Sequence, residues 1–137
     1  MPSAPFITIT RINSTIKDLL TNIFDLSPLE VDLLLFLIAN NDRQLTLEEL
    51  ARETNRDKST AFRSLQKLVN LGICIKDTKT LKGGGYYHTY NAIDVKSFKI
   101  ITERKVKEIQ QSFDRLLKRF EHDLEQQVLS FYKKKQK

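Results

Sequence analysis

Three helix start signals lie between residues 27 and 57, and they restrict this chain to short helices separated by sharp turns. Two are capping boxes, in which an N-cap hydroxyl and a glutamate three residues later each accept the other's backbone N–H: Ser27 with Glu30, and Thr46 with Glu49. The third is Asp57, an N-cap that follows a three-residue turn, Thr54-Asn55-Arg56. These signals predict helices over about 28–40, 47–53 and 58–70, with Gly72 ending the last.

The helix predicted over 28–40 is apolar almost all round, so we expect it at the centre of the core. Before it, apolar residues at helical spacing predict a first helix over about 13–25. Residues 1–10 are rich in proline and then β-prone, which is typical of an arm or a short edge strand.

Three of the four glycines in the chain, Gly83, Gly84 and Gly85, stand between two β-prone stretches over residues 73–79 and 86–91. This pattern predicts a β-hairpin with a flexible tip that carries no side chains. A short helix, a tight turn, a longer helix and then a hairpin form a helix-turn-helix followed by a β-wing. We therefore expect a mainly α fold with a small β-hairpin wing (α+β), that is, a winged helix-turn-helix.

A final long helix is predicted over roughly 95–133, with Asp94 as its cap and no Gly or Pro inside it. Its apolar residues recur in steps of three and four, as in a coiled-coil seam, with one irregularity around Asp123. The residues predicted to form a dimer through this seam are Val106, Ile109, Phe113, Leu116, Leu117, Phe120, Leu124 and Val128. The predicted organisation is an N-terminal arm and helix (1–26), a winged helix-turn-helix domain (27–92) and a long C-terminal dimerisation helix (93–137).

Charge is distributed unevenly along the chain, whose formal net charge is +6. Residues 1–54 contain 4 Lys or Arg against 8 Asp or Glu, whereas residues 55–91 contain 7 against 2 and residues 92–137 contain 12 against 7. A basic region of this kind favours a polyanionic partner, although Lys and Arg that only solubilise helices would give the same totals.

The positions of the basic residues favour DNA as that partner. On the helix over 58–70, basic and hydroxyl side chains lie on or beside one face, and apolar residues define the opposite, inward face. The residues predicted to point inward are Ala61, Phe62, Leu65, Leu68 and Val69. The major groove, about 12 Å wide, accepts such a helix, and there Arg63 suits guanine or, equally, a phosphate. The candidate DNA-binding residues are Arg56, Lys58, Ser59, Thr60, Arg63 and Lys67, with Lys79, Lys82, Gly83, Gly84, Gly85 and Tyr87 in the wing.

No catalytic or metal-binding pattern stands out. Cys74 is the single cysteine and is expected to be a small buried hydrophobe, and with His88 and His122 isolated it cannot complete a zinc site. The glycine-rich tip lacks the Lys-Ser/Thr sequel of a phosphate-binding loop. We expect a protein with no enzymatic activity, metal or cofactor. Because no signal peptide and no apolar run of about 20 residues is visible, we also expect a cytoplasmic location and no membrane contact.

The segment from Leu26 to Cys74 resembles the winged-helix domain of small archaeal transcriptional regulators, the TrmB-like and leucine-responsive-regulator-like proteins, which are related to MarR-type repressors. The stretches LTLEELA (45–51) and DKSTAFRSLQKLVNLGI (57–73) carry most of the resemblance. It implies a dimeric transcription factor in which Lys58, Ser59, Thr60 and Arg63 face bases or phosphates. A wing and a long C-terminal dimerisation helix are typical of that group. The resemblance leaves open whether residues 6–24 also take part in the dimer.

Three functions are compatible with these features. The first, which the basic outward face favours, is a sequence-specific regulator that binds double-stranded DNA as a homodimer. The second is a non-specific architectural or chromatin-like DNA-binding protein. The third is a winged-helix adaptor that binds other proteins of the transcription machinery. No motif identifies a small-molecule effector.

Overall fold

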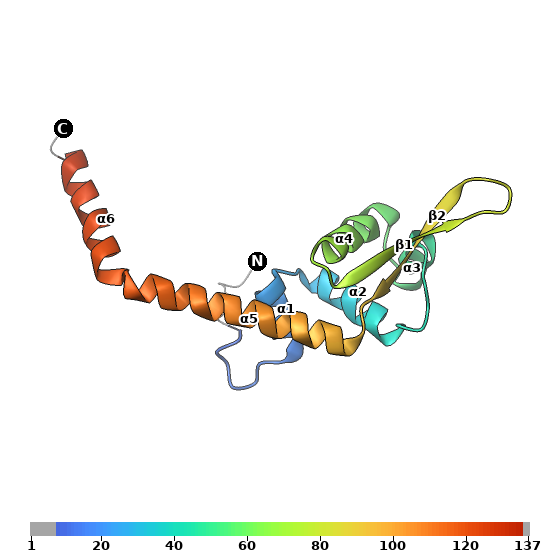
Figure 1. Cartoon of the computed structure of the whole chain (residues 1–137), viewed down its shortest axis with the longest axis horizontal. Helices are drawn as coiled ribbons and strands as arrows, with labels where there is room; N and C mark the ends of the chain where they lie inside the picture. Colours follow the sequence, from blue (N-terminus) through green and yellow to red (C-terminus); the bar gives the residue numbers. More distant parts are fainter. Residues whose placement is uncertain (1–7, 136–137) are drawn as a thin grey trace. The chain divides into compact units, whose positions relative to one another are not determined.

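A computed structural model describes residues 8–135 of the chain. Within this range six helices and two strands follow one another (Figure 1): α1 (Ile16–Phe24), α2 (Pro28–Ala39), α3 (Leu47–Glu53), α4 (Lys58–Asn70), β1 (Cys74–Thr80), β2 (Tyr86–Ala92), α5 (Val95–Lys118) and α6 (Phe120–Lys135). This order confirms the predicted mainly helical fold with a hairpin wing. The chain forms two compact units, residues 1–101 and 102–137, which divide within α5.

The starts of α2, α3 and α4 are the predicted ones because all three caps form. The Ser27 N–H donates to Glu30 Oε1 at 2.8 Å, and the Glu30 N–H donates to Ser27 Oγ at 3.2 Å. The same reciprocal pair joins Thr46 and Glu49 at the start of α3. The Asp57 carboxylate accepts the Thr60 N–H at 3.2 Å and so caps α4.

The core of the first unit lies between α2, the two helices of the helix-turn-helix and the base of the hairpin. Its largest side chains are less than 2% exposed: Leu20, Leu34, Leu37, Leu45, Leu50, Leu65, Leu68, Ile73 and Val31. The central position predicted for α2 is confirmed by its four buried residues, Val31, Leu33, Leu34 and Leu37. A stacked pair of rings, Phe24 and Phe98 with centroids 5.9 Å apart and planes at 26°, packs α1 against the start of α5.

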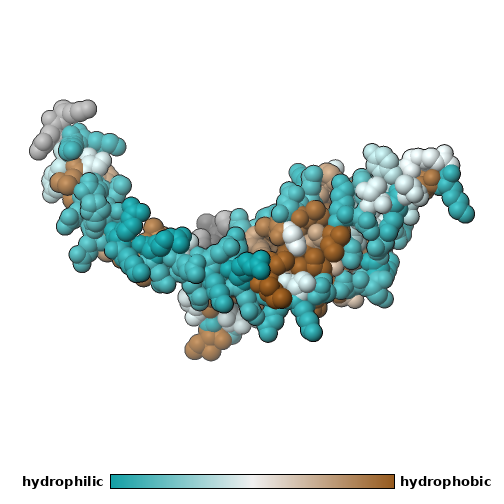
Figure 2. Space-filling view, in the orientation of Figure 1, coloured by the Kyte–Doolittle hydropathy of each residue, from teal (hydrophilic) through white to brown (hydrophobic). Residues whose placement is uncertain are grey.

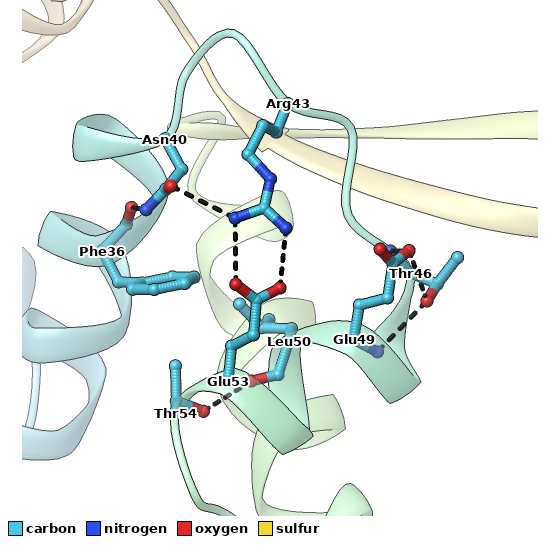
Figure 3. Close-up of polar contacts among 8 residues, drawn as sticks. All are labelled: Phe36, Asn40, Arg43, Thr46, Glu49, Leu50, Glu53 and Thr54. Carbon is cyan, nitrogen blue, oxygen red and sulfur yellow. Dashed lines mark hydrogen bonds and ion pairs between the residues drawn. The ribbon is translucent and has the colours of Figure 1, made fainter.

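An arginine fixes the loop between α2 and α3 (Figure 3). Arg43 donates from Nη1 to Glu53 Oε1 at 2.9 Å and from Nη2 to Glu53 Oε2 at 2.7 Å. Its Nη1 also lies 3.3 Å from Oδ1 of Asn40, whose own amide donates to the Phe36 carbonyl. The guanidinium therefore joins the end of α2 to the end of α3.

The two strands pair antiparallel from Cys74↔Ala92 to Thr80↔Tyr86. At the tip, Gly84 and Gly85 have φ angles of 97° and 85°, which residues other than glycine rarely adopt. The sequence did not predict one further pairing. Leu45 and Tyr90 exchange two backbone hydrogen bonds, with N···O distances of 3.1 and 2.7 Å, and this isolated bridge extends the sheet to the loop before α3.

The structure corrects the prediction for the N-terminal segment. Residues 8–10 form turns rather than an edge strand, and residues 1–7 lie outside the described range. The first helix begins at Ile16 instead of Asn13, because Asp18 accepts a hydrogen bond from the Thr15 N–H at 2.8 Å and so places the cap at Thr15.

The long C-terminal helix predicted over 95–133 is present, but it is interrupted at Arg119, where α5 ends and α6 begins. The Arg119 N–H donates to the Leu116 carbonyl at 3.3 Å, three residues back rather than four, which is a locally tightened turn. The break lies about one helical turn before the predicted irregularity around Asp123, in the stretch where the apolar steps after Leu116 become consecutive fours. The predicted Asp94 cap does form, since Asp94 Oδ1 accepts the Ser97 N–H at 2.8 Å.

Candidate nucleic-acid interface

The inward face of α4 is formed by Ala61, Ser64, Leu65 and Leu68, all of which are buried. This differs from the prediction in one respect that matters for function. Phe62 was expected on the inward face, yet 39% of it is exposed, while Ser64 is buried. Successive helical residues are about 100° apart, so residues 62 and 64 point in nearly opposite directions, and burying Ser64 turns Phe62 outward.

The outward face of α4 consists of exposed side chains that follow one another along the helix: Ser59, Phe62, Arg63, Gln66 and Asn70. Ser59 and Arg63 were predicted to be there, whereas Gln66 and Asn70 were not named. Helical spacing alone would have included these two amides, because each lies three or four residues beyond a predicted member. Within residues 8–135, neither Arg63 nor Gln66 makes a side-chain hydrogen bond or an ion pair.

The first turn of α4 is held rigid by its cap. Thr60 donates from its hydroxyl to Asp57 Oδ1 at 2.6 Å, and this bond together with the Thr60 N–H lowers the pKa of Asp57. The Thr60 hydroxyl is therefore already used within the helix. The preceding turn places Asn55 at φ 54°, a left-handed conformation that asparagine tolerates better than most residues.

The predicted DNA-binding cations of the helix-turn-helix fall into two groups. Arg56 and Lys58 are exposed, and Lys58 Nζ lies 3.3 Å from Glu48 Oε1 in a pair whose two side chains are 63% and 60% exposed. Such a pair contributes little to stability, so the lysine can exchange its partner. Lys67 is different, because it donates to Glu30 Oε1 at 3.0 Å and to the Asp25 carbonyl oxygen. It connects α4 to the start of α2.

The wing extends beyond the helices of the first unit, and in Figure 2 its distal part is pale with a hydrophilic end. Lys82 and the three glycines are exposed at the tip, and Tyr87 is 41% exposed. Lys79 is held within the hairpin, since its Nζ lies 3.2 Å from Asp77 Oδ2. Of the predicted wing residues, Lys82 and the glycines are thus the most accessible.

The cysteine and the histidine of the hairpin, Cys74 and His88, are occupied in packing and hydrogen bonding. Cys74 is buried, and desolvation raises the pKa of its thiol to about 12, so it is a poor nucleophile at neutral pH. His88 Nδ1 lies 3.2 Å from the Thr78 hydroxyl across the hairpin. In the described part of the chain no three His, Cys, Asp or Glu side chains gather as metal ligands would.

Among residues 8–135, no helix combines the length and apolarity that spanning a bilayer requires.

The second unit carries the predicted apolar seam largely uncovered. Val106 and Ile109 are half-buried, and the remaining members are exposed by 45% to 70%: Phe113, Leu116, Leu117, Phe120, Leu124 and Val128. Fully burying an exposed side chain of this kind is worth about 1.5–3 kcal/mol, and because these side chains are only partly covered, a single chain leaves an apolar surface in water.

The helix-turn-helix, its outward cationic and amide-bearing helix and the adjoining hairpin define a winged-helix transcriptional regulator. Comparison with known proteins gives the family. Residues 20–96 match the family described as sugar-specific transcriptional regulator TrmB, and the chain belongs to it, as the sequence resemblance implied. Members of this family regulate transcription, which is a binding role rather than a catalytic one.

Individual proteins are also similar to this chain in sequence or in fold. The protein MJ1503 of Methanocaldococcus jannaschii is 29% identical over 94 residues, which cover 69% of this chain and 70% of the relative. A possible transcriptional regulator from Methanosarcina mazei has the same fold, with a TM-score of 0.71 and 21% identity over 81% of this chain and 95% of the other. A mutant of S. aureus MepR, bound to an oligodeoxyribonucleotide, is more distant, with a TM-score of 0.50 and 14% identity over 89% and 88% of the two chains.

Proposed function

We propose that this protein is a homodimeric transcriptional regulator that binds specific sequences of double-stranded DNA. In each protomer α4 enters the major groove, and the wing contacts the adjacent backbone or minor groove. The observation that carries the proposal is the outward face of α4. Its central residue, Arg63, is exposed and bonded to no other described side chain, on a helix whose first turn is fixed by Asp57.

The chemistry of this face suits a duplex. The guanidinium of Arg63 offers two parallel N–H donors, which match O6 and N7 of guanine or two oxygens of a phosphate. Arg56 and Lys58 flank the start of the helix, and Lys82 stands at the wing tip, so all three are exposed cations available to phosphates. We leave Lys67 out of the proposed contact surface because its ammonium is bound to Glu30.

The homodimer is supported by the exposed seam of α5 and α6. A second copy of the chain offers the same apolar residues, and pairing the two seams would remove both from water. A two-fold dimer would place two copies of α4 on a pseudo-palindromic site. The half-sites would then lie about one helical turn, roughly 34–36 Å, or a multiple of it apart.

Selection of bound sequences from a random duplex pool, performed with the full chain at two salt concentrations, tests the proposal. We expect a pseudo-palindromic consensus and an affinity that falls steeply with log salt. A ratio of specific to random binding near one would instead indicate an architectural DNA-binding protein. If no duplex binds at low salt and polymerase components copurify with the chain, the protein is an adaptor.

A further inference from the structure

The outward face of α4 carries two side chains that a phosphate-binding surface does not need. Phe62 is 39% exposed on a helix face that is otherwise polar, and it stacks on no other aromatic ring within residues 8–135. Gln66, one turn further along, is exposed, and its side chain makes no hydrogen bond in the same range. A phenyl ring and a primary amide both lack charge, so neither adds to the electrostatic attraction that dominates non-specific binding to DNA.

We propose that Phe62 and Gln66 select A·T base pairs next to the position contacted by Arg63. Phe62 would lie against the 5-methyl group of a thymine, and Gln66 would bond to N6 and N7 of an adenine. This inference rests on the proposed function, because it assumes that α4 occupies the major groove. It adds the base preference of the half-site, which family membership does not provide.

The packing beneath α4 explains why Phe62 is available. The core under the helix is already filled by Ala61, Leu65 and Leu68, each at most 2% exposed. Ser64 occupies the remaining inward position, so the ring of Phe62 is left at the edge of the outward face. An aromatic ring in that place lowers the free energy of the complex when it contacts an apolar group of the partner, because the contact removes the ring from water.

The chemistry of the major groove offers one apolar group, the thymine 5-methyl, which makes thymine the partner of choice for Phe62. The amide of Gln66 has a donor and an acceptor side by side, and adenine presents the complementary N6–H donor and N7 acceptor. Guanine presents two acceptors instead, which suit Arg63. The three side chains therefore differ in the base that each prefers.

The spacing of these residues agrees with neighbouring base pairs. A helix rises about 1.5 Å per residue, so Phe62 and Gln66 are about 6 Å apart along the axis. Successive base pairs are about 3.4 Å apart, and 6 Å corresponds to fewer than two steps. With Arg63 between them, the three contacts fall within about three consecutive pairs.

Base analogues test the inference without depending on a variant that folds. In the duplex preferred in the selection, single thymines of the half-site are replaced by deoxyuridine, which removes only the methyl group. For the wild-type protein we expect about a fourfold loss of affinity at one thymine, the effect of losing one buried methyl-sized group. Replacing adenine by 7-deazaadenine removes N7, and we expect a loss of about fivefold or more at one adenine.

Variants then assign each contact to a residue. Phe62→Ala should bind the thymine and uracil duplexes equally, Phe62→Leu should keep part of the methyl effect, and Gln66→Ala should be insensitive to 7-deazaadenine. Gln111→Ala is the matched control, since it removes the same amide from an exposed position of α5, outside the proposed DNA surface, and should respond to both analogues as wild type does. Thermal unfolding of Phe62→Ala shows whether the variant is folded under the binding conditions.

The outcomes separate this inference from the proposed function. If no duplex sequence is preferred, the proposed function is wrong and the inference falls with it. If a specific site is found but neither analogue weakens binding anywhere in the half-site, the inference alone is overturned. Equal sensitivity of Phe62→Ala and wild type to the loss of the thymine methyl would also contradict the role of Phe62.

Discussion

Lys67 on α4 and Glu30 on α2 form an ion pair in which Nζ lies 3.0 Å from Oε1. The same carboxylate oxygen accepts the Ser27 N–H that caps α2, and the same ammonium donates to the Asp25 carbonyl. One contact therefore connects the start of the central helix to the helix proposed to enter DNA. Lys67 therefore has a structural role, although it lies on a basic helix.

We expect Glu30→Gln to lower the free energy of unfolding by about 1 kcal/mol, since it weakens both a helix cap and a partly exposed ion pair. Burial raises the pKa of Glu30, but the hydrogen bonds from Ser27 and Lys67 outweigh it, so the pKa lies below its ordinary value of 4.5. The stabilisation is therefore present above about pH 4.5 and is lost as the pH falls through the lowered pKa.

Urea unfolding of wild type and Glu30→Gln between neutral pH and about pH 3 measures this difference. The gap between the two proteins should narrow as the solution becomes acidic. A gap that is constant or grows at low pH would mean that the Glu30 charge is not stabilising.

Lys67→Met and Lys58→Met form a matched pair of charge removals on α4. Because Lys67 is bound to Glu30 and Lys58 is exposed beside Glu48, we expect Lys67→Met to lower the melting temperature more. Lys58→Met should instead reduce the salt slope of DNA binding by about one. Scanning calorimetry and binding at several salt concentrations check both, and equal effects of the two substitutions on the slope would return Lys67 to the contact surface.

Arg63→Ala should cost about 1–3 kcal/mol of specific binding if the guanidinium contacts guanine, while binding to random duplex stays nearly unchanged. Competition binding with the selected and a random duplex measures both quantities. Arg56→Ala is the comparison. Because Arg56 lies outside the helix, loss of its charge is expected to weaken binding to both duplexes by the same factor. Equal losses for Arg63→Ala on the two duplexes would assign this residue to a phosphate.

Lys82→Ala should weaken binding to all sequences to a similar extent and lower the salt slope by about one, since the side chain stands at the exposed wing tip. Lys79→Ala should have a smaller effect because Lys79 lies on β1, away from the tip, and is paired with Asp77 of the same strand. The slope of log affinity against log salt distinguishes the two. No change of slope for Lys82→Ala would remove the wing tip from the interface.

Phe113→Glu combined with Phe120→Glu should give monomers and weaken DNA binding, because two charges would then lie on the apolar seam. Sedimentation equilibrium measures the association state. Gln111→Glu with Gln126→Glu adds the same charge at two exposed polar positions and should remain dimeric. A dimer that survives the first pair of substitutions would show that the association uses another surface.

Local signals in the sequence were sufficient for most of the helix-turn-helix and its wing. Each cap joins residues three apart, so Ser27, Thr46 and Asp57 could be recognised as helix starts without knowing the fold. The tip glycines were recognisable for the same reason, since a turn is a property of a few consecutive residues.

Long-range contacts were not predictable in this way. The backbone bridge between Leu45 and Tyr90 joins two distant residues, and no local motif in the sequence indicates that they pair. The ion pair of Arg43 and Glu53 closes a loop whose path the sequence does not specify. The break at Arg119 shows a related difficulty, because neither Gly nor Pro marks it.

Neighbouring residues were enough to specify where the helices of the winged domain begin, which segments form the hairpin and which stretch of the chain is basic. The rotation of α4 about its axis, in contrast, is a result of packing between elements that are distant in the chain. That rotation depends on which side chains fit against the other helices, and it turned Phe62 and Gln66 outward and assigned Lys67 to Glu30.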